Sequence, residues 1–267
     1  MSRTANVLIP TSVDEAVSSF GDGSGVTVIG GGTIVMAELA SGRSPVSTAL
    51  ILSRAGLSGI TREGATIRIG ATTPLEALVG QTPDPLSTAT QRVGDYELRG
   101  QATIGGNLCA GPGRDTPRGD LQAPLIALAA VVRTTGADGE RAQSVEDFLA
   151  GGPDRRLVLD VEFVEPTRGA YASMGRPHAR VYTALSVACA ERSEGTRVAI
   201  GGAGPAGTRA LSVEQALAEG ASTEDAAARV LDDVEPADDA LASGWYRRKT
   251  LPTLVSRALA DLAKESV

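Results

Sequence analysis

Two glycine-rich segments, each preceded by an apolar run, limit most strongly what this chain can fold into. The first reads VTVIGGGTIVM over residues 26 to 36, and the second reads QATIGGNLCAGPGRDTPRGDL over residues 101 to 121. Glycine permits backbone turns and close approaches that a Cβ atom forbids. In both segments the apolar residues before the glycines are typical of a strand end. The segments are therefore either two unrelated turns or two halves of one site.

Backbone N–H groups at glycines can bind a diphosphate, and a helix that follows them adds to the attraction. The first segment is weak evidence for this on its own, because a tight turn from strand to helix explains three glycines equally well. The G-x-G-x-x-G spacing is absent from residues 30 to 36, and neither segment is followed by the Lys-Ser or Lys-Thr pair of a P-loop. Two loops with Thr and Asn donors suit another way of holding a dinucleotide.

The composition is that of an ordinary globular protein. The chain has 267 residues, of which 42% are hydrophobic and 21% charged, so it can bury a large core. A net charge of −7 argues against a general nucleic-acid binder, which relies on Lys and Arg. No apolar run is long enough to span a membrane, and the first residues lack the apolar core of a signal peptide. We expect a cytoplasmic protein.

The supply of metal ligands and nucleophiles is small. Cys109 and Cys189 are the only cysteines, and His178 is the only histidine. These residues cannot build an iron–sulfur cluster, a structural zinc site or a Ser-His-Asp triad. We therefore expect no metal site and no catalytic side chain in this chain. Its chemistry should belong to a bound organic cofactor or to a partner.

The first part of the chain alternates helices and strands. Ser12 with Glu15 predicts a helix start. Thr73 and Pro74 predict the cap and first residue of another helix. Further helices are expected over residues 33 to 39 and 85 to 93, and strands over 26 to 29, 49 to 52 and 66 to 71.

The remainder changes pattern. Parallel strand–helix–strand periodicity stops after residue 66, so we predict a mixed α+β protein. A strand from 127 to 134, a helix from Ser144 and a strand from 156 to 164 precede a loop from 165 to 177, which is the best internal boundary. Alternation in the last of these strands places Leu157, Leu159, Val161 and Phe163 on one face. Beyond the loop we expect strands over 181 to 190 and 196 to 200, and helices over 213 to 217, 224 to 231 and 240 to 263, the last broken at Pro252.

One segment carries a family resemblance. RGQATIGGNLCA resembles the T-I-G-G-N segment of the FAD-binding subunit of molybdenum hydroxylases, the xanthine and carbon monoxide dehydrogenase family. The likeness extends in order along nearly the whole chain, through PTSVDEAV, VIGGGTIVM, IRIGATTPLEAL, GDLQAPLIALAA, IGGAGPAGTRA and WYRRKTLPTLVSRAL. The segments taken together are far more specific than T-I-G-G-N alone.

The resemblance implies a vanillyl-alcohol-oxidase-like (PCMH-type) FAD-binding domain followed by a smaller C-terminal α+β domain. The first domain would cover residues 1–165 as two α/β subdomains that meet near residue 57. The second would cover residues 166–267 as a small antiparallel sheet with helices.

The resemblance also implies the FAD-binding residues. Both glycine segments would grip the diphosphate, and an aspartate would bind the polar part of the flavin nucleotide. The implied residues are Gly30, Gly31, Gly32, Thr33, Ile34, Val35, Thr103, Ile104, Gly105, Gly106, Asn107 and Asp120. Asp115 competes with Asp120 for the aspartate role, and Asp120 is favoured because Leu121 and the apolar helix after it align with the family. Cys109 either lines the flavin pocket or fills the core.

Ser173 departs from the family pattern. YASMGRP resembles Y-x-K-x-G-R, and Ser173 stands where the family has lysine. This replacement removes a cation that could stabilise reduced flavin.

The implied function is that of an FAD-dependent oxidoreductase acting as an electron-transfer subunit. A molybdopterin-bearing large subunit would oxidise the substrate, and a [2Fe-2S] small subunit would pass electrons to this FAD and on to a terminal acceptor. Two alternatives stay open: a self-sufficient FAD-dependent oxidoreductase, and a flavin-free relative that serves in assembly.

Overall fold

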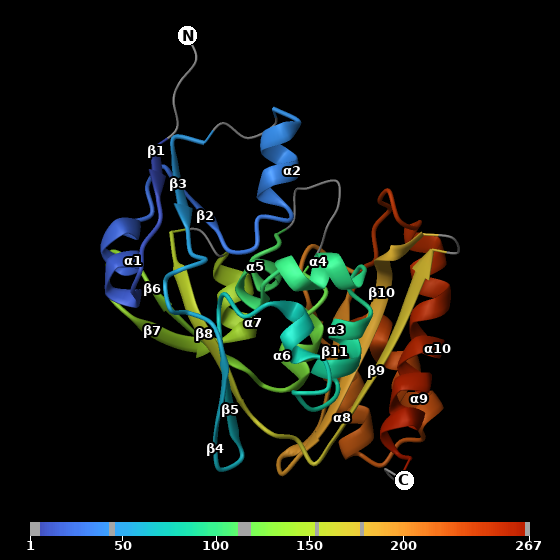
Figure 1. Cartoon of the computed structure of the whole chain (residues 1–267). Helices are drawn as coiled ribbons and strands as arrows, with labels where there is room; N and C mark the ends of the chain where they lie inside the picture. Colours follow the sequence, from blue (N-terminus) through green and yellow to red (C-terminus); the bar gives the residue numbers. More distant parts are fainter. Residues whose placement is uncertain (1–5, 43–45, 112–118, 153–154, 177–178, 265–267) are drawn as a thin grey trace.

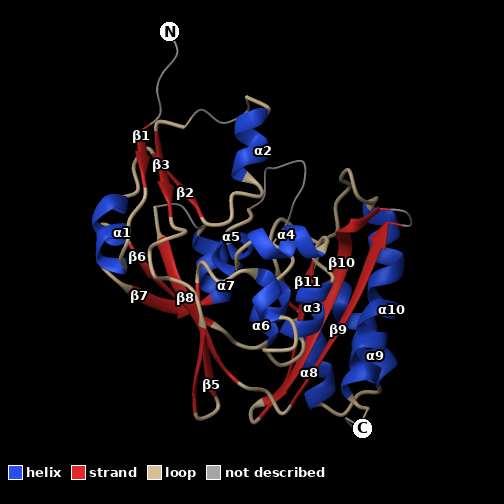
Figure 2. Cartoon of the chain, viewed as in Figure 1, coloured by secondary structure: helices blue, strands red, loops and turns tan. Residues whose placement is uncertain are grey.

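The computed structural model describes residues 6–42, 46–111, 119–152, 155–176 and 179–264. Three β-sheets are arranged around a group of short helices, with longer helices on the outside (Figures 1 and 2). The predicted α+β fold class is confirmed.

The N-terminal sheet is parallel, in the order β1-β3-β2. Its strands are β1 (Asn6–Leu8), β2 (Val26–Ile29) and β3 (Thr48–Ile51). Helix α1 (Val13–Phe20) begins where predicted, with the Ser12 hydroxyl accepting a hydrogen bond from the N–H of Glu15 at 3.1 Å. Ala16 and Phe20 of α1 are buried together with Leu50 of β3, so this helix is held against the sheet by apolar packing. Helix α2 (Val35–Ala40) has no buried residue and projects from the body (Figure 1).

The central sheet is antiparallel, in the order β4-β5-β8-β6-β7. Its strands are β4 (Ile60–Glu63), β5 (Thr66–Gly70), β6 (Val131–Thr135), β7 (Arg141–Ser144) and β8 (Leu157–Val164). The helical segments between β5 and β8 are η1 (Leu75–Leu78), α3 (Leu86–Gln91), α4 (Tyr96–Gln101), α5 (Ile104–Leu108), α6 (Gln122–Ala127) and α7 (Val145–Gly151). These short helices fill the space between the central and C-terminal sheets (Figure 2).

The C-terminal sheet is antiparallel, in the order β12-β11-β10-β9, and its two faces pack against different helices. The strands are β9 (Arg168–Arg176), β10 (Ala179–Arg192), β11 (Gly195–Gly201) and β12 (Thr208–Arg209). The outer helices are α8 (Leu211–Ala218), α9 (Thr223–Ala228), η2 (Arg229–Asp232) and α10 (Gly244–Leu262). Ala188 and Ala190 belong to the large core that includes α6, whereas Val187 and Cys189 belong to the core under α10. Alternate residues of one strand therefore serve two cores.

Two predicted boundaries are wrong. The segment from 165 to 177 was expected to be a loop, but β9 occupies Arg168–Arg176. Its glycines and arginines are tolerated because β9 is an edge strand, paired only with β10. The strand expected from residue 127 begins at Val131, because α6 runs to Ala127 and Ala129 turns the chain with φ 51°.

Three local predictions are also wrong. Thr73 does not cap a helix: its hydroxyl donates to the carbonyl of Gly70 and accepts from the N–H of Gly59, and η1 begins at Leu75. Helix α10 continues across Pro252, because its buried face packs on both sides of that residue. Val161 and Phe163 lie in a different core from Leu157 and Leu159, beyond a register shift in β8.

Candidate functional site

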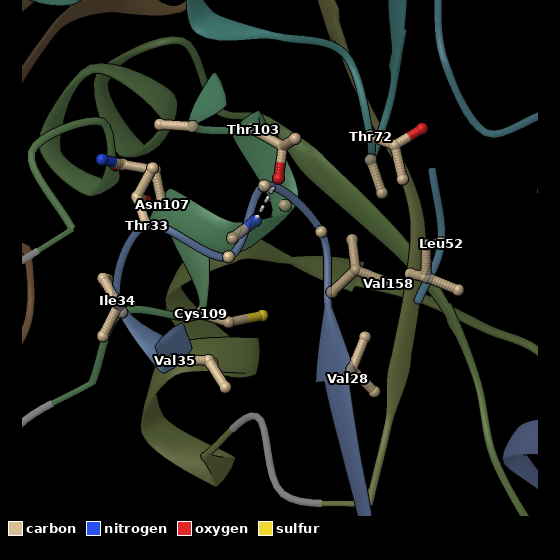
Figure 3. A pocket seen from close by; sticks show the side chains of 18 of the residues that line it. Val28, Thr33, Ile34, Val35, Leu52, Thr72, Thr103, Asn107, Cys109 and Val158 are labelled. Atoms are coloured by element: carbon tan, nitrogen blue, oxygen red, sulfur yellow. Dashed lines mark hydrogen bonds between the residues drawn. The ribbon is translucent and has the colours of Figure 1, made fainter. Parts of the chain in front are cut away.

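A cavity of about 460 Å³ lies where the N-terminal sheet meets the central sheet and helix α5. Its walls include strand β2, the loop after it, the turn between α4 and α5, and the start of β8. Figure 3 shows Val28, Leu52 and Val158 on one side of this cavity and Thr33 and Asn107 on the other. The volume is within the usual range for sites that bind small molecules.

The two glycine segments touch each other at this cavity. A Cβ atom on Gly31 would overlap the carbonyl oxygen of Gln101, and one on Gly30 would lie 2.5 Å from the hydroxyl oxygen of Thr103. Gly32 adopts φ 75°, which other residues rarely do. The first segment therefore has glycines at these positions because the second segment passes directly against its backbone.

The first loop presents unused backbone donors to the cavity. In the described part of the chain, the N–H groups of Gly31, Gly32 and Thr33 form no hydrogen bond. All three residues line the cavity. Buried or half-buried amides usually find an acceptor, so three consecutive unpaired N–H groups indicate a place where a ligand supplies one.

The second segment has a different geometry from the one expected. Thr103 is not at a strand end; it follows helix α4 and caps helix α5, with a single bridge to Pro74. Its backbone donors are already in use. The N–H of Ile104 bonds the carbonyl of Thr73 at 3.1 Å, and that of Gly105 bonds the carbonyl of Ala71 at 2.9 Å. The N–H of Gly106 bonds the Thr103 hydroxyl oxygen at 3.2 Å.

The two glycines of this segment differ in their surroundings. A Cβ atom on Gly105 would lie 2.8 Å from the carbonyl oxygen of Ala71, so Gly105 serves packing. Gly106 is exposed at the cavity wall and would meet only the Thr103 hydroxyl, at 3.0 Å. The side-chain oxygen of Asn107 accepts from the N–H of Leu121 at 2.9 Å, which fixes the amide beside the cavity and leaves its NH₂ group as a donor.

The structure gathers the predicted site residues, with one exception. Ile104 is fully buried in the large core and does not reach the cavity. Asp120 lines the cavity, whereas Asp115 and His178 lie outside the described residues. The remaining predicted residues that line the cavity are Gly30, Gly31, Gly32, Thr33, Ile34, Val35, Thr103, Gly105, Gly106 and Asn107.

Sequence reasoning missed the apolar wall of the cavity. Val26, Val28, Leu52 and Val158 form part of it. A usable signal was present in β8, since period-2 alternation places Val158 on the face opposite Leu157. No comparable signal marks Leu52, which reaches the cavity through the pairing of β3 with β2.

Two arginines also line the cavity. Arg156 is fixed, because its guanidinium donates to the Thr134 hydroxyl at 2.9 Å and to the Gly139 carbonyl at 2.8 Å and also pairs with Asp138. Arg155 adopts φ 60°.

Cys109 lies on the cavity wall, as one of the two predicted alternatives had it. Burial of its sulfur raises the pKa of the thiol to about 12. The thiol is therefore neutral at physiological pH and is a poor nucleophile.

Within the described ranges, no three His, Cys, Asp or Glu side chains come close enough together to hold a metal ion. In that same part of the chain, no helix is both long and apolar enough to cross a membrane.

Two family models match the chain. Residues 3–164 match the FAD binding domain in molybdopterin dehydrogenase, and residues 170–262 match the CO dehydrogenase flavoprotein C-terminal domain. The first match contains the whole cavity wall.

Curated relatives are similar over part of the sequence. The glyceraldehyde dehydrogenase medium chain of Sulfolobus acidocaldarius is 28% identical over 192 residues, which is 66% of this chain and 66% of the relative. The carbon monoxide dehydrogenase medium chain of Afipia carboxidovorans is 33% identical over 128 residues, which is 43% of each. The matched segments thus span less than two thirds of these relatives.

Solved structures share the fold over almost the full length. A chain of carbon monoxide dehydrogenase from Hydrogenophaga pseudoflava superposes with a TM-score of 0.84 at 24% identity, covering 98% of both chains. A chain of quinoline 2-oxidoreductase from Pseudomonas putida 86 gives 0.83 at 18% identity with the same coverage. With the family matches, which together include most of the sequence, these likenesses agree with the resemblance in the glycine segments. The chain belongs to the family of FAD-binding subunits of molybdopterin dehydrogenases.

Proposed function

We propose that FAD binds across this cavity with its diphosphate against the first glycine loop. The observation that carries the proposal is the row of unpaired N–H groups at Gly31, Gly32 and Thr33. A diphosphate presents several oxygens that accept such bonds, and the glycines let it approach the backbone closely. The Thr103 hydroxyl and the Asn107 amide add side-chain donors from the second segment.

The two sides of the cavity suit the two ends of a dinucleotide. Val28, Leu52 and Val158 offer apolar surface to a planar base, and Asn107 and Asp120 offer polar groups to the ribityl and flavin part. This assignment keeps residues 1–165 as the FAD-binding domain and residues 166–267 as the C-terminal domain.

The chain then serves as the electron-transfer subunit of a molybdenum dehydrogenase complex. Bound FAD can take electrons singly and release them in pairs, a property of the cofactor itself. The sequence contains two cysteines and one histidine, too few to hold the clusters that would feed it. A [2Fe-2S] small subunit and a molybdopterin large subunit supply those centres, in accord with the medium-chain names of the relatives.

The purified protein tests the binding proposal. It should carry about one FAD per chain, and acid precipitation should release that FAD because Cys109, a cysteine on the cavity wall, is held as a neutral thiol. A colourless protein that cannot be reconstituted with FAD would contradict the proposal.

Purification from the native cell tests the complex. Larger metal-bearing chains should accompany this one, and the isolated chain should accept electrons from artificial donors but leave hydroxylase substrates such as aldehydes and purines unchanged. Steady turnover of such a substrate by the isolated chain, free of molybdenum and iron, would favour the self-sufficient flavoenzyme instead.

A further inference from the structure

Two neighbouring arginines line the cavity, but only one of them is engaged with the rest of the protein. Arg156 pairs with Asp138 and donates further hydrogen bonds around the β6–β7 turn. Arg155 is exposed at the cavity wall, and its guanidinium forms no hydrogen bond or ion pair with any residue that the structure describes. The pKa of the nearby Asp22 is lowered chiefly by hydrogen bonds from Ser24 and to a smaller degree by the charge of Arg155. The donors of Arg155 therefore stay available to a ligand.

The backbone of Arg155 is held in a conformation that arginine does not favour. Its φ is 60°, in the left-handed region where glycine, asparagine and aspartate are the usual residues. Two glycines pack against it: a Cβ atom on Gly23 would lie 3.0 Å from the Cα atom of Arg155, and one on Gly136 would lie 2.9 Å from its carbonyl oxygen. Glycine would suit this position in the fold better, so the arginine side chain needs another explanation.

Strand β2 sets the position of Arg155 along the cavity. The glycine loop follows Ile29, the last residue of β2, whereas Gly23, which touches Arg155, precedes Val26, the first residue of β2. A strand of 4 residues spans about 13 Å. Phe20 lies beside Gly23 and also lines the cavity. Arg155 is therefore at the end of the cavity away from the glycine loop, next to an aromatic ring.

We propose that Arg155 is a cofactor-binding residue whose guanidinium contacts the adenine of FAD at the end of the cavity where β2 begins. This inference rests on the proposed binding of FAD with its diphosphate against the glycine loop, because one half of the cofactor must then extend along β2. The apolar side chains Val28, Leu52 and Val158 line this path and suit a planar base better than a ribityl chain.

A guanidinium is well matched to adenine. Its plane stacks on aromatic rings, and its N–H groups donate to the ring nitrogens of a base. An arginine that has no ion pair keeps both its faces and its donors free for such contacts. Binding would give Arg155 the partner that it lacks in the apoprotein, and it would account for an arginine at a left-handed backbone position.

The proposal separates cofactor affinity from stability. Arg155→Gly removes the side chain and lets the backbone keep φ 60° without strain, which offsets the added freedom of the unfolded chain. The apoprotein should therefore be about as stable as the wild type. The same change should weaken FAD binding roughly tenfold, the value of a cation–π contact in a partly desolvated site. Arg155→Lys keeps the charge but not the planar group, and it should still bind FAD about threefold more weakly than the wild type.

The experiment compares FAD with ADP, which carries the adenine half and a diphosphate but no flavin. Dissociation constants are measured calorimetrically for the wild-type apoprotein, the two Arg155 variants and the control Arg257→Ala, whose residue is exposed on α10 and does not line the cavity. Each Arg155 variant should lose the same factor for FAD and for ADP. The absorption spectrum of bound FAD should stay unchanged, because the flavin lies at the other end, and Arg257→Ala should match the wild type.

Other patterns of affinity would overturn the inference. Unchanged FAD affinity, or a loss for FAD without a loss for ADP, would show that Arg155 does not contact the adenine half. Full affinity in Arg155→Lys would leave only a long-range effect of charge. A less stable Arg155→Gly apoprotein would assign the side chain to the fold.

The wild-type protein separates this inference from the proposed function. A wild-type apoprotein that binds FAD but not ADP would overturn the inference, since the adenine half would then not be held here. Failure of the wild-type protein to bind FAD would instead contradict the proposed function, so the two failures are distinguishable.

Discussion

The two glycine segments look alike in sequence but do different work in the structure. The first keeps the N–H groups of Gly31, Gly32 and Thr33 unpaired at the cavity. The second uses its N–H groups internally, because Thr103 caps a helix and Gly105 bonds Ala71. Glycine is needed in the first loop because the backbone of Gln101 passes against Gly31. It is needed at Gly105 because the carbonyl oxygen of Ala71 occupies the space that a side chain would need. Similar glycine-rich compositions therefore have different roles. The first loop offers hydrogen-bond donors to the cavity, and the second packs against neighbouring backbone.

Gly31→Ala should have the largest effect, because it acts where the loops meet. Its Cβ atom would overlap the backbone carbonyl of Gln101, which cannot move without displacing Thr103. We expect a loss of more than about 3 kcal/mol in the free energy of unfolding, with loss of bound FAD. Chemical denaturation measures the first and flavin content the second. Gly100→Ala is the control, since nothing lies within 4 Å of its Cβ position; a stable Gly31→Ala protein would show that the loops are not in contact.

Gly105→Ala should destabilise the protein without changing its affinity for FAD. The new methyl group would lie 2.8 Å from the Ala71 carbonyl oxygen, away from any donor that the cofactor needs. The free energy of unfolding should fall by about 1 to 2 kcal/mol, part of the strain being offset by the higher helix propensity of alanine. Titration of the folded fraction with FAD checks the affinity. A large loss of affinity with intact stability would return Gly105 to the phosphate-binding role.

Gly106 allows charge to be separated from size. Gly106 is exposed at the cavity wall, so Gly106→Asn and Gly106→Asp should both fold. The aspartate places a negative charge beside the proposed diphosphate, and it should weaken FAD binding about tenfold more than the isosteric asparagine does. The difference should shrink as salt is added. Equal affinities for the two variants would place the diphosphate elsewhere.

The smallest effect concerns Cys109, which lies within the second segment. Its pKa is about 12 in the folded protein against 9.0 for an ordinary thiol. The unfolded state thus loses its proton first, and stability that is complete below pH 9 declines as the pH rises. Between pH 9 and pH 10 the Cys109→Ala apoprotein should lose less stability than the wild type, by up to about 1 kcal/mol. Parallel denaturation curves at both pH values would contradict the raised pKa.

The sequence predicted which segments line the cavity, but it did not predict their local conformation or their hydrogen bonds. Glycine clusters and their order along the chain identified the loops that line the cavity, because close backbone approach leaves few other choices of residue. The same reasoning placed Thr103 at a strand end, since Thr-Ile before glycines gives the same local pattern in a strand and in a helix cap. It could not show that the amides of Ile104 and Gly105 are engaged, because their acceptors, Thr73 and Ala71, lie far away in sequence.

In the fold too, features that depend on local sequence were predicted, and features that depend on distant contacts were not. Long segments with a clear period, such as those of α1 and of the β10–β11 hairpin, were found at nearly the right residues. The failures at β9 and Pro252 come from tertiary contacts. Strand β9 forms its hydrogen bonds with β10. In α10, packing of the buried face compensates for the backbone hydrogen bond that Pro252 cannot form. Neither partner can be read from the local segment.

In the proposed electron-transfer function, the C-terminal sheet would affect the distance that electrons have to cross. Strand β10 contributes alternate residues to the core around α6 and to the core under α10. A strand shared in this way leaves no hinge between the two parts, because bending it would open both cores at once. A flavin held in the cavity, which residues of the first core such as Ala71 and Val158 help to line, would then keep a constant spacing to a redox centre docked against the C-terminal part. Tunnelling rates depend steeply on such a spacing, so the alanines of β10 would help to set a rate without touching an electron carrier.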